Sequence, residues 1–460
     1  MKPLVIKPVN AVRGIVAFTG DKSIAHRAVI LSALSQGLTT IENFPANKDC
    51  IYTVSALSSY GVKIKSSLTD KRKSILKLIV NGNGLYGLKP PKKKIFVGAS
   101  GTTLRLLVGL ASGQKFSSHF YTDSSLARRP MRRITEPLRL MGAIIKSQVT
   151  SHKSQVEEYP PLSVFPASLK GIKYTLPVAS AQVKSAILLA GLYASGEIKI
   201  IEKEPTRDHT ERMFKFFRAE LHCHGKNIRF KARKVLVSPG RIYVPGDISS
   251  AAFFLVMATL LKRSRLVIKK VSLNPTRIGI IDVLKRMGAN IKINLSKDKV
   301  SAFEPMGDII ISSSVLRAVR IQKEQIPALV DELPILMVAA SLSKGKSVFE
   351  GVNELRVKET DRIKSMVEGL RRMGADISVR KSFDKEIIEI NGINCLHAAN
   401  LKSYGDHRTA MSLVVAAMLA VGVSKIDDIS CVNKSFPNFL KTIIDLRGQK
   451  FRPRRSKKAR

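Results

Sequence analysis

The sequence contains six copies of one unit of helices and strands, at a spacing of roughly 75 residues. Each copy has an apolar, alanine-rich segment and then an amphipathic segment that usually ends in Gly-Ala or Gly-Val. The apolar segments begin at Arg27, Thr103, Ser185, Ser250, Pro334 and Arg408, and the amphipathic segments at Ser55, Ile134, Glu211, Ile281, Ser365 and Phe439. A unit of this size cannot bury its apolar face alone, so the copies must stack around shared cores.

These segments predict an α+β fold of two similar domains. The apolar segments have no polar face, which is typical of buried helices, whereas the amphipathic ones suit the surface. The turn-rich stretch 244–250 opens the fourth unit and predicts a crossing between domains. A strand at residues 4–6 that pairs with the second half would make residues 19–21 a second crossing. We therefore expect domains of residues 1–20 with 245–446 and of residues 21–244, with the binding site in the cleft between them.

The chain is strongly basic, with a formal net charge of +43 over 460 residues. Such a charge attracts nucleic acid non-specifically and also steers small anions. Aromatic residues make up 6% of the chain and Trp is absent, so base-stacking platforms are few and we expect no specific nucleic-acid partner. An RNA-binding protein is the alternative from another functional class. Residues 447–460 are expected to form a basic, disordered tail.

The lengths of the apolar runs and the spacing of the cysteines indicate in which cellular compartment the protein works. The longest apolar runs, such as residues 413–423, are shorter than the about 18 residues that a membrane span needs, so we expect no membrane partner. Residues 1–20 show no secretory signal, and the four cysteines form no close pair, which favours reduced thiols in a cytoplasmic protein. The fragment His222-Cys-His224 lacks a partner cluster, so we predict no metal site.

One charged stretch, residues 354–363, combines cations with a carboxylate between a strand-like run and an amphipathic helix expected over residues 363–373. On a helix, Lys358 and Arg362 would lie four apart on one face, with Glu359 beside Lys358. Cations beside a carboxylate at such a turn suit an anionic substrate that needs a proton moved. Taken alone, the stretch equally suits a solvated helix start with local ion pairs.

Polar and cationic residues recur where loops meet the other buried segments. A hydroxyl, cations and free backbone N–H groups at a helix start form a receptor for anions. The recurrent groups are Lys22, Ser23 and Arg27 in the first unit, residues 98–103 and Arg129 in the second, 179–185 and 206–211 in the third, Asp331 and Glu332 in the fifth, and 404–408 and 431–437 in the sixth. Asp331 is either a helix cap or a base. Solvated charges have no reason to recur at one joint, so we predict convergence on one or more polyanionic ligands.

A glycine pattern at residues 82–87 matches the dinucleotide-binding sequence GxGxxG. It is followed by Leu88-Lys-Pro-Pro91, which cannot open the helix that such a site requires. No Walker A sequence is present either. We therefore expect no nucleotide cofactor.

Nine motifs in register resemble the 5-enolpyruvylshikimate-3-phosphate synthase family of enolpyruvyl transferases. In chain order they are GDKSIAHR, GASGTTLR, SLARRPM, SAQVKSA, TRDHTERM, PGDISSAAFF, LRVKETDRI, YGDHRTAM and KSFP, and the match covers residues 4 to about 446. The resemblance implies two domains, each of three βαβαββ units, that form an inside-out α/β barrel and close over shikimate 3-phosphate and phosphoenolpyruvate.

The activity that the resemblance implies is transfer of the enolpyruvyl group to the 5-hydroxyl of shikimate 3-phosphate by addition–elimination, with release of phosphate. This reaction is a step of the shikimate pathway to chorismate and the aromatic amino acids, and it needs no metal or cofactor. We expect the two substrates to be the only partners of a monomer.

The resemblance also assigns the shikimate 3-phosphate site. It implies that Ser23 and Arg27 hold the carboxylate, with Ser180, Gln182 and Lys358 around the phosphate and the ring. Lys22 would contact both substrates, and Gln182 would also face phosphoenolpyruvate.

For phosphoenolpyruvate, the resemblance implies that Arg129 and Lys434 meet the phosphate and that Gly101 provides a backbone clamp. Arg362 and Arg408 would grip the carboxylate, for which the planar guanidinium allows two parallel hydrogen bonds.

The implied catalytic residues are Lys22, Asp331 and Glu359. Asp331 would contact shikimate 3-phosphate and take the 5-hydroxyl proton, and Glu359 would protonate the methylene carbon of the enol. One carboxylate that accepts a proton and another that donates one need different pKa values, and the neighbouring Lys358 and Lys22 are candidates for setting them.

Three positions depart from the family pattern. Ala99 replaces an Asn found in many members, while Ala181 and His209 replace a Ser and a Tyr of one branch, which leaves sensitivity to glyphosate open. The sister transferase that acts on UDP-N-acetylglucosamine has the same architecture. That enzyme has Lys-Asn where this chain has Lys22-Ser23. It also has a Cys in the region that matches residues 99–131, where this chain has none.

Overall fold

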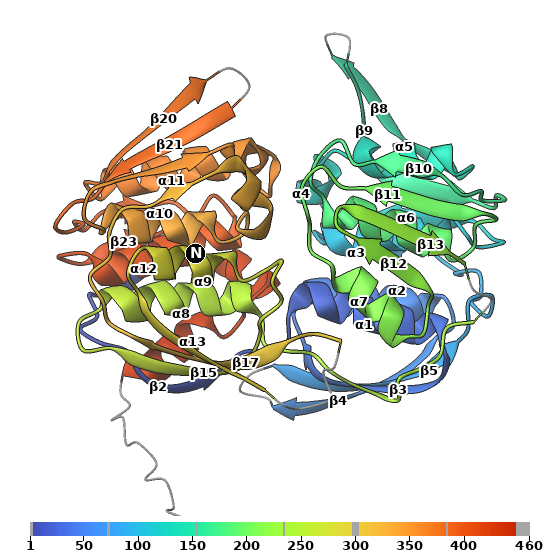
Figure 1. Cartoon of the computed structure of the whole chain (residues 1–460), viewed down its shortest axis with the longest axis horizontal. Helices are drawn as coiled ribbons and strands as arrows, with labels where there is room; N and C mark the ends of the chain where they lie inside the picture. The colour runs from blue at the N-terminus through green and yellow to red at the C-terminus, as the bar shows by residue number, and fades with distance from the viewer. Residues whose placement is uncertain are drawn as a thin grey trace, which may run out of the picture.

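The computed structural model describes residues 3–70, 74–152, 155–232, 235–296, 303–382 and 385–447, which form two lobes side by side (Figure 1). Buried apolar side chains fall into two clusters. We call the lobe around the cluster from residues 6–18 and 248–446 the first lobe, and the lobe around the cluster from residues 24–244 with Phe303 the second lobe.

Each described lobe contains three sheets, and five of these six sheets repeat one topology. In three of the five the chain order is strand, helix, strand, helix, strand, strand, and in the sheet the fourth strand lies between the second and the third. The other two have the same spatial order, but in one the second lobe is inserted after the first strand, and in the other the strand in the first position, Arg241–Tyr243, comes last in the chain. The first strand is parallel to the second, and the remaining pairs are antiparallel. This order repeats the six-unit pattern of the sequence.

In the second lobe the sheets are β14 (Arg241–Tyr243), β3 (Gln36–Pro45), β5 (Ile75–Asn83) and β4 (Lys63–Asp70); β6 (Ile95–Phe96), β7 (Ser118–Tyr121), β9 (Gln155–Phe165) and β8 (Ile144–His152); and β10 (Lys173–Thr175), β11 (Glu197–Ile201), β13 (Asn227–Lys231) and β12 (Leu221–His224).

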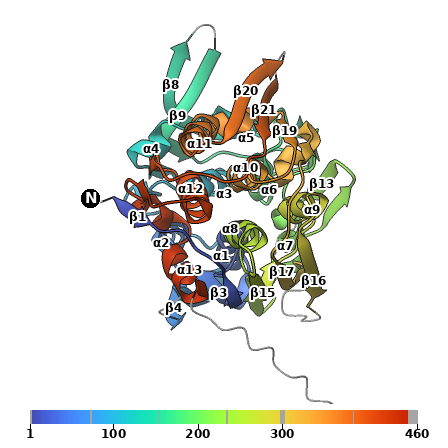
Figure 2. The ribbon, with the colours of Figure 1, turned by 90° about the vertical axis from the view of Figure 1, so that its left-hand side faces the viewer.

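In the first lobe they are β16 (Asn290–Leu295), β17 (Met306–Ser312), β15 (Arg265–Ser272) and β2 (Arg13–Ala17); β18 (Arg320–Ile321), β19 (Lys346–Glu350), β21 (Lys385–Asn391) and β20 (Asp376–Ser382); and β1 (Leu4–Ile6), β23 (Ser424–Ile426) and β22 (Asn400–Leu401). The hairpins β8–β9 and β20–β21 project in the same direction from the two lobes (Figures 1 and 2).

The six apolar segments form helices buried in the two cores, as the sequence predicts. They are α1 (Lys22–Leu34), α3 (Gly101–Ala111), α6 (Ala181–Gly191), α8 (Ile248–Leu260), α10 (Leu333–Ser341) and α12 (His407–Leu419). Phe254 of α8 is fully buried and its ring contacts those of Phe18, Phe436 and Phe439. Helices that are apolar all round are therefore confirmed as core elements.

The amphipathic segments form helices with one buried face. They are α2 (Lys48–Ser59), α5 (Arg132–Leu140), α7 (His209–Phe216), α9 (Gly279–Arg286), α11 (Arg362–Arg372) and α13 (Phe439–Arg447). Since α13 continues through Arg447, the expected tail cannot begin there, and residues 448–460 lie outside the described residues. No helix in the described ranges is long and apolar enough to cross a bilayer.

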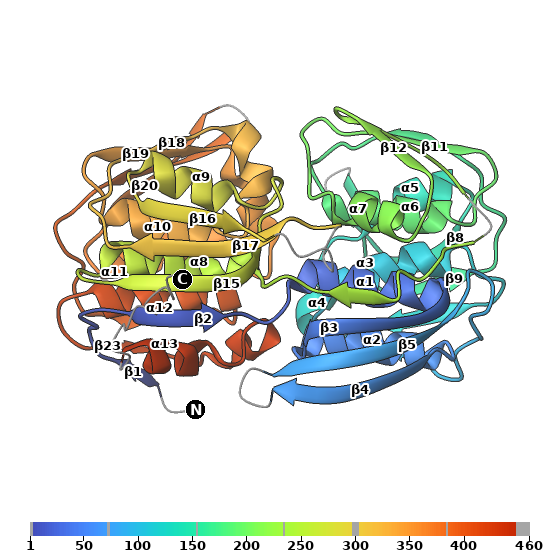
Figure 3. The same cartoon turned by 60° about the horizontal axis from the view of Figure 1, so that its bottom comes forward.

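The chain passes between the lobes at two adjacent points. The segment from β2 to α1 and the segment from β14 to α8 are hydrogen-bonded to each other: Asp21 N donates to Pro245 O (2.7 Å) and Asp247 N to Thr19 O (3.0 Å). Figure 3 shows β2 lying beside β15, its partner in the sheet. At Gly20 a Cβ would lie 2.3 Å from the carbonyl oxygen of Asn43, so this close approach requires glycine. The expected pairing of residues 4–6 with the second half is confirmed, since β1 pairs with β23.

The charged stretch 354–363 is not the start of one helix. A 3₁₀ helix, η3 (Val352–Val357), follows β19, and α11 begins only at Arg362, where Asp361 accepts a hydrogen bond from Lys364 N (2.9 Å). The prediction that Lys358 and Arg362 share a helix face is therefore wrong. The cause is the cap at Asp361 together with Arg356, whose guanidinium bonds to that carboxylate and to Glu386.

Candidate active site

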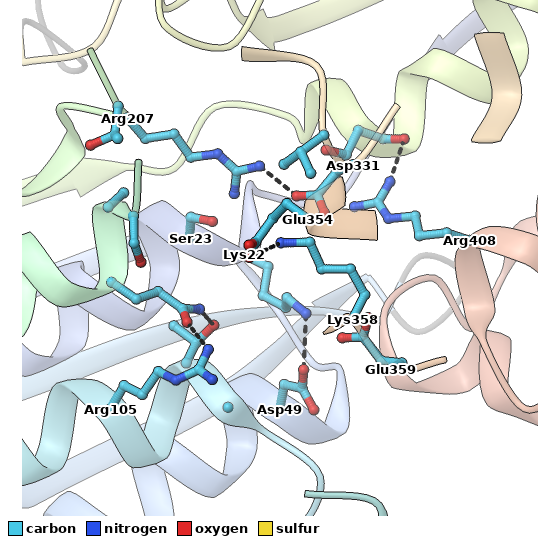
Figure 4. Close-up of a pocket in the computed structure, with 18 of the residues that line it drawn as sticks. Lys22, Ser23, Asp49, Arg105, Arg207, Asp331, Glu354, Lys358, Glu359 and Arg408 are labelled. Carbon is cyan, nitrogen blue, oxygen red and sulfur yellow. Dashed lines mark hydrogen bonds and ion pairs between the residues drawn. The ribbon is translucent and has the colours of Figure 1, made fainter. Parts of the chain in front are cut away.

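A cavity of about 170 Å³ lies between the two lobes, where the starts of several buried helices meet. Its walls include ten Lys or Arg and six Asp or Glu side chains, so positive charge is in excess. Of the thirteen predicted site residues, Lys434, which ends η4 (Ser430–Lys434), is not among the described residues of the wall. The other twelve line the cavity: Lys22, Ser23, Arg27, Gly101, Arg129, Ser180, Gln182, Asp331, Lys358, Glu359, Arg362 and Arg408. Figure 4 labels Lys22, Ser23, Asp331, Lys358, Glu359 and Arg408 among them.

Arg27 lies on the second turn of α1, with its guanidinium held by three hydrogen bonds. It donates to Thr210 Oγ1 (2.7 Å), Ser185 Oγ (2.7 Å) and the carbonyl oxygen of Ser23 (2.8 Å). Burial lowers the pKa of Arg27 to about 10, which leaves it charged at neutral pH. Since α1 begins at Lys22, this helix start presents a fixed cation and backbone donors to an anion.

The start of α6 contributes a hydroxyl and an amide. Ser180 caps the helix by accepting a hydrogen bond from Val183 N (3.4 Å). Gln182 donates from Nε2 to Thr102 Oγ1 (2.9 Å) and accepts from Arg105 at its carbonyl oxygen (2.5 Å). The amide of Gln182 therefore has a fixed orientation, and it connects α6 to α3.

Gly101 begins α3, where the helix lies against Arg129. A Cβ at Gly101 would lie 3.0 Å from Arg129 NH1, tighter than nearly all real contacts. The Nε atom of Arg129 is buried without a hydrogen-bond partner in the described part of the chain. Glycine here therefore leaves space for a guanidinium with unused donor capacity beside a helix start.

Glu359 lies between two guanidiniums, one from each lobe. Its carboxylate is 2.5 Å from Arg362 NH2 and 3.5 Å from Arg129 NH1. Burial would raise the pKa of Glu359, but Arg362 and Arg129 outweigh that effect and hold its pKa well below the usual value. Glu359 is therefore ionised here, and an anion that draws the guanidiniums away would raise its pKa.

Asp331 occupies a comparable position just before α10. Its carboxylate is 2.5 Å from Arg207 NH2 of the second lobe and 3.4 Å from Arg362 NH1 of the first. Burial would raise the pKa of Asp331, but Arg207, Arg408 and Arg362 hold its pKa well below the usual value. Asp331 is therefore an ionised carboxylate, the state that a base requires.

Two lysines of the wall have opposite pKa shifts. Burial would lower the pKa of Lys22, but the carboxylate of Asp49, 2.9 Å away, outweighs it and raises that pKa. Burial lowers the pKa of Lys358, and Glu354, 3.0 Å away, offsets this only in part. Figure 4 shows both lysines with these carboxylate partners.

Among the ion pairs of the described residues that join the lobes across the cavity, three share one arrangement. In each, a carboxylate of the first lobe meets an arginine of the second: Asp331 with Arg207, Glu359 with Arg129, and Glu354 with Arg133. An anionic ligand would compete with these carboxylates for the same guanidiniums. The site can therefore bind anions and move protons through two carboxylates, and no cluster of metal-ligating side chains occurs in the described ranges.

Sequence reasoning missed several residues of the wall. Arg105 lies four residues after Gly101 on α3, and this helical spacing could have indicated it. Arg133 lies on α5, which begins only after Arg129, so the same spacing does not apply to it. Arg207 lies in the motif 206–211, but its partner Asp331 is 124 residues away in the sequence. Arg277 follows an Asn-Pro-Thr turn and has no signal in the sequence at all.

The three departures from the family pattern fall in different places. Ala99 and Ala181 line the cavity, so their small side chains bear directly on its shape. His209 is fully buried, with Nδ1 2.5 Å from Glu304 of the other lobe, and it is not among the described residues of the wall.

The chain is similar to known proteins over nearly its whole length. The sequence model of the family EPSP synthase (3-phosphoshikimate 1-carboxyvinyltransferase) matches residues 6–443. Among curated proteins, the 3-phosphoshikimate 1-carboxyvinyltransferase of Geotalea daltonii is 42% identical over 94% of this chain and 96% of its own length. That of Geobacillus kaustophilus is 43% identical over 94% and 97%.

Solved structures give the same result. A structure of EPSP synthase from Acinetobacter baumannii superposes with a TM-score of 0.82 and 38% identity, covering 97% of this chain and 98% of that one. Both the sequence model and the relatives span nearly the whole chain, which therefore belongs to the EPSP synthase family of carboxyvinyl transferases.

Proposed function

We propose that this chain transfers the enolpyruvyl group of phosphoenolpyruvate to the 5-hydroxyl of shikimate 3-phosphate, by addition–elimination with release of phosphate. Membership of the family makes the chain a carboxyvinyl transferase of the shikimate pathway. The observation that carries the proposal is that Asp331 and Glu359 meet the cations of both lobes in a single cavity.

In this proposal the two core clusters correspond to two domains, residues 1–20 with 245–446 and residues 21–244, each of three βαβαββ units in an inside-out α/β barrel. The repeated sheet order and the adjacent chain crossings support this division. Phe303 is an exception, since it joins the core of the second lobe.

Shikimate 3-phosphate would bind at the starts of α1 and α6. Ser23 and Arg27 would receive its carboxylate, and the fixed guanidinium of Arg27 supports this role. Ser180, Gln182 and Lys358 would surround the phosphate and the ring, with Lys22 and Asp331 toward the reacting hydroxyl.

Phosphoenolpyruvate would bind at the start of α3. Its phosphate would displace Glu359 from Arg129, beside Gly101 and Gln182, and its carboxylate would lie between Arg362 and Arg408. Lys22 would lie between the two substrates. Lys434 lies outside the cavity, so its proposed contact with the phosphate requires η4 to move closer.

The protons would move through the two carboxylates. Asp331, held ionised by arginines, would accept the 5-hydroxyl proton. Glu359 would acquire a proton as substrate draws Arg129 and Arg362 away, and would deliver it to the methylene carbon. We also propose that the enzyme is a cytoplasmic monomer that requires no metal or cofactor.

The test is release of inorganic phosphate by the purified chain. Release should require both shikimate 3-phosphate and phosphoenolpyruvate, and UDP-N-acetylglucosamine should not replace the first. Phosphate release only with the nucleotide sugar would instead assign the chain to the sister reaction. No release with either acceptor, from folded protein in chelator-free buffer and in EDTA, would contradict the proposal.

A further inference from the structure

Arg277 lies in the wall of the cavity, where the starts of three buried helices meet. It follows β15, its side chain is 2% exposed, and NH2 donates to Ser249 Oγ (2.6 Å). Asp21, which caps α1, Asp247, which caps α8, and Glu332, just before α10, have carboxylate oxygens 3.6, 3.8 and 4.0 Å from NH2. The positive ends of three helix dipoles would repel a guanidinium, and these carboxylates compensate.

Asp21 and Asp247 also lie in the two segments where the chain crosses between lobes. Arg277 is therefore anchored to the junction of the lobes rather than to one helix. Ser249 strengthens the anchor, since its hydroxyl also donates to Glu332.

The NH1 edge of the Arg277 guanidinium lies toward Asp331. NH1 of Arg277 is 3.8 Å from Asp331 Oδ2, beyond hydrogen-bond distance, and NH1 and Nε have no hydrogen-bond partner in the described part of the chain. The same Oδ2 atom is 2.5 Å from Arg207 of the other lobe. If an anionic substrate draws Arg207 away, Oδ2 loses this partner, and the free NH1 donor is within reach after a small rotation of Asp331.

We infer that Arg277 is a positioning residue, whose guanidinium receives the carboxylate of Asp331 when substrate engages Arg207 and so fixes the base relative to the junction of the lobes. This inference rests on the proposed role of Asp331 as the base. The cations that face Asp331 are Arg207, Arg277, Arg362, Arg408 and Lys358, and its loss of Arg207 makes the contribution of Arg277 larger.

The experiment compares Arg277→Met, Arg277→Lys and the control Arg139→Met by the pH dependence of kcat. Arg139 is a suitable control because its guanidinium pairs with the buried carboxylate of Glu158, and neither residue lines the cavity. In Arg277→Met, loss of a cation close to Asp331 should move the acid limb of kcat up by about one pH unit, with the KM of both substrates within about twofold. The acid limb should stay in place in Arg277→Lys and in Arg139→Met.

An unchanged acid limb in folded Arg277→Met would overturn the inference, and so would an equal shift in Arg139→Met. If Arg277→Met does not fold, the double variant Arg277→Met/Glu332→Gln removes one of the three carboxylates that lose their cation, and the same shift is expected of it. The variant Asp331→Asn distinguishes failure of the proposed function from failure of the role of Arg277. Nearly full turnover in Asp331→Asn would contradict the proposed function itself. An inactive Asp331→Asn with an unshifted Arg277→Met would contradict only the role of Arg277.

Discussion

Replacing Glu359 with Gln should slow turnover while tightening the binding of phosphoenolpyruvate. Gln cannot supply a proton, so if Glu359 is the general acid, kcat should fall by about 10²-fold or more, which corresponds to about 2.7 kcal/mol or more in the barrier. Gln also carries no charge, so Arg129 and Arg362 would no longer be held by a carboxylate before the substrate arrives.

The gain in binding follows from these two ion pairs. The Glu359 side chain is 30% exposed, so solvent screens them and their net contribution should be near the upper end for exposed pairs, about 1 kcal/mol. That difference corresponds to a KM for phosphoenolpyruvate about fivefold lower. A loss of kcat together with a lower KM is characteristic of a group that acts on the proton while competing with the substrate for the same cations.

Steady-state phosphate release, with shikimate 3-phosphate saturating, measures both constants. Glu368→Gln is a suitable control, because Glu368 lies on α11, just after the segment that carries Glu359, and pairs with Arg372 at the surface. Turnover near that of the unmodified chain would refute the acid role and reduce Glu359 to a partner of Arg362. A raised KM would refute the competition between the carboxylate and the substrate.

Three further predictions concern space, packing and pH. Gly101→Ala should raise the KM for phosphoenolpyruvate more than that for shikimate 3-phosphate, because the new methyl group would displace the Arg129 guanidinium; equal changes in steady-state KM would contradict this. Phe254→Ala should lower the free energy of unfolding by about 3–5 kcal/mol, as measured by denaturant titration, and a loss below about 1 kcal/mol would mean that the core repacks. Because the pKa values of Asp331 and Glu359 are lowered on folding, their ion pairs stabilise the chain above the ordinary carboxyl pKa, and this stability is lost as pH falls through the lowered pKa values. The double variant Asp331→Asn/Glu359→Gln should therefore lose less stability than the unmodified chain from about pH 5 downward. Parallel declines in the free energy of unfolding of the two proteins would contradict this prediction.

The helices and the site motifs could be predicted because their signals are local. Segments such as residues 250–261 are apolar on every side, and burial follows from that alone. The cations before each helix could be recognised at their joints, and twelve of the thirteen predicted site residues line the cavity.

The remaining features depend on contacts between distant residues. The bend between η3 and α11 is stabilised by the cap at Asp361, which lies within residues 354–363, and by the pair of Arg356 with Glu386, 30 residues away, which that stretch does not reveal. The pairing of Arg207 with Asp331 and the place of Arg277 likewise exist only once the lobes have come together. Lys434 was assigned by its motif, which carries no information on how far η4 lies from the cavity.

The two adjacent crossings have a consequence for the order in which the chain folds during synthesis. Arg13 of β2 donates to the carbonyl of Arg263, 250 residues later. At roughly 5–20 residues per second, a ribosome needs about 12–50 s to make that partner. Among the described residues, the apolar core of the second lobe comes from residues 24–244 and takes only Phe303 from beyond them, so this core can form before β2 pairs with β15. A chain that ends near residue 245 and has been released from the ribosome should thus already protect the second lobe from protease, with the first eighteen residues still exposed.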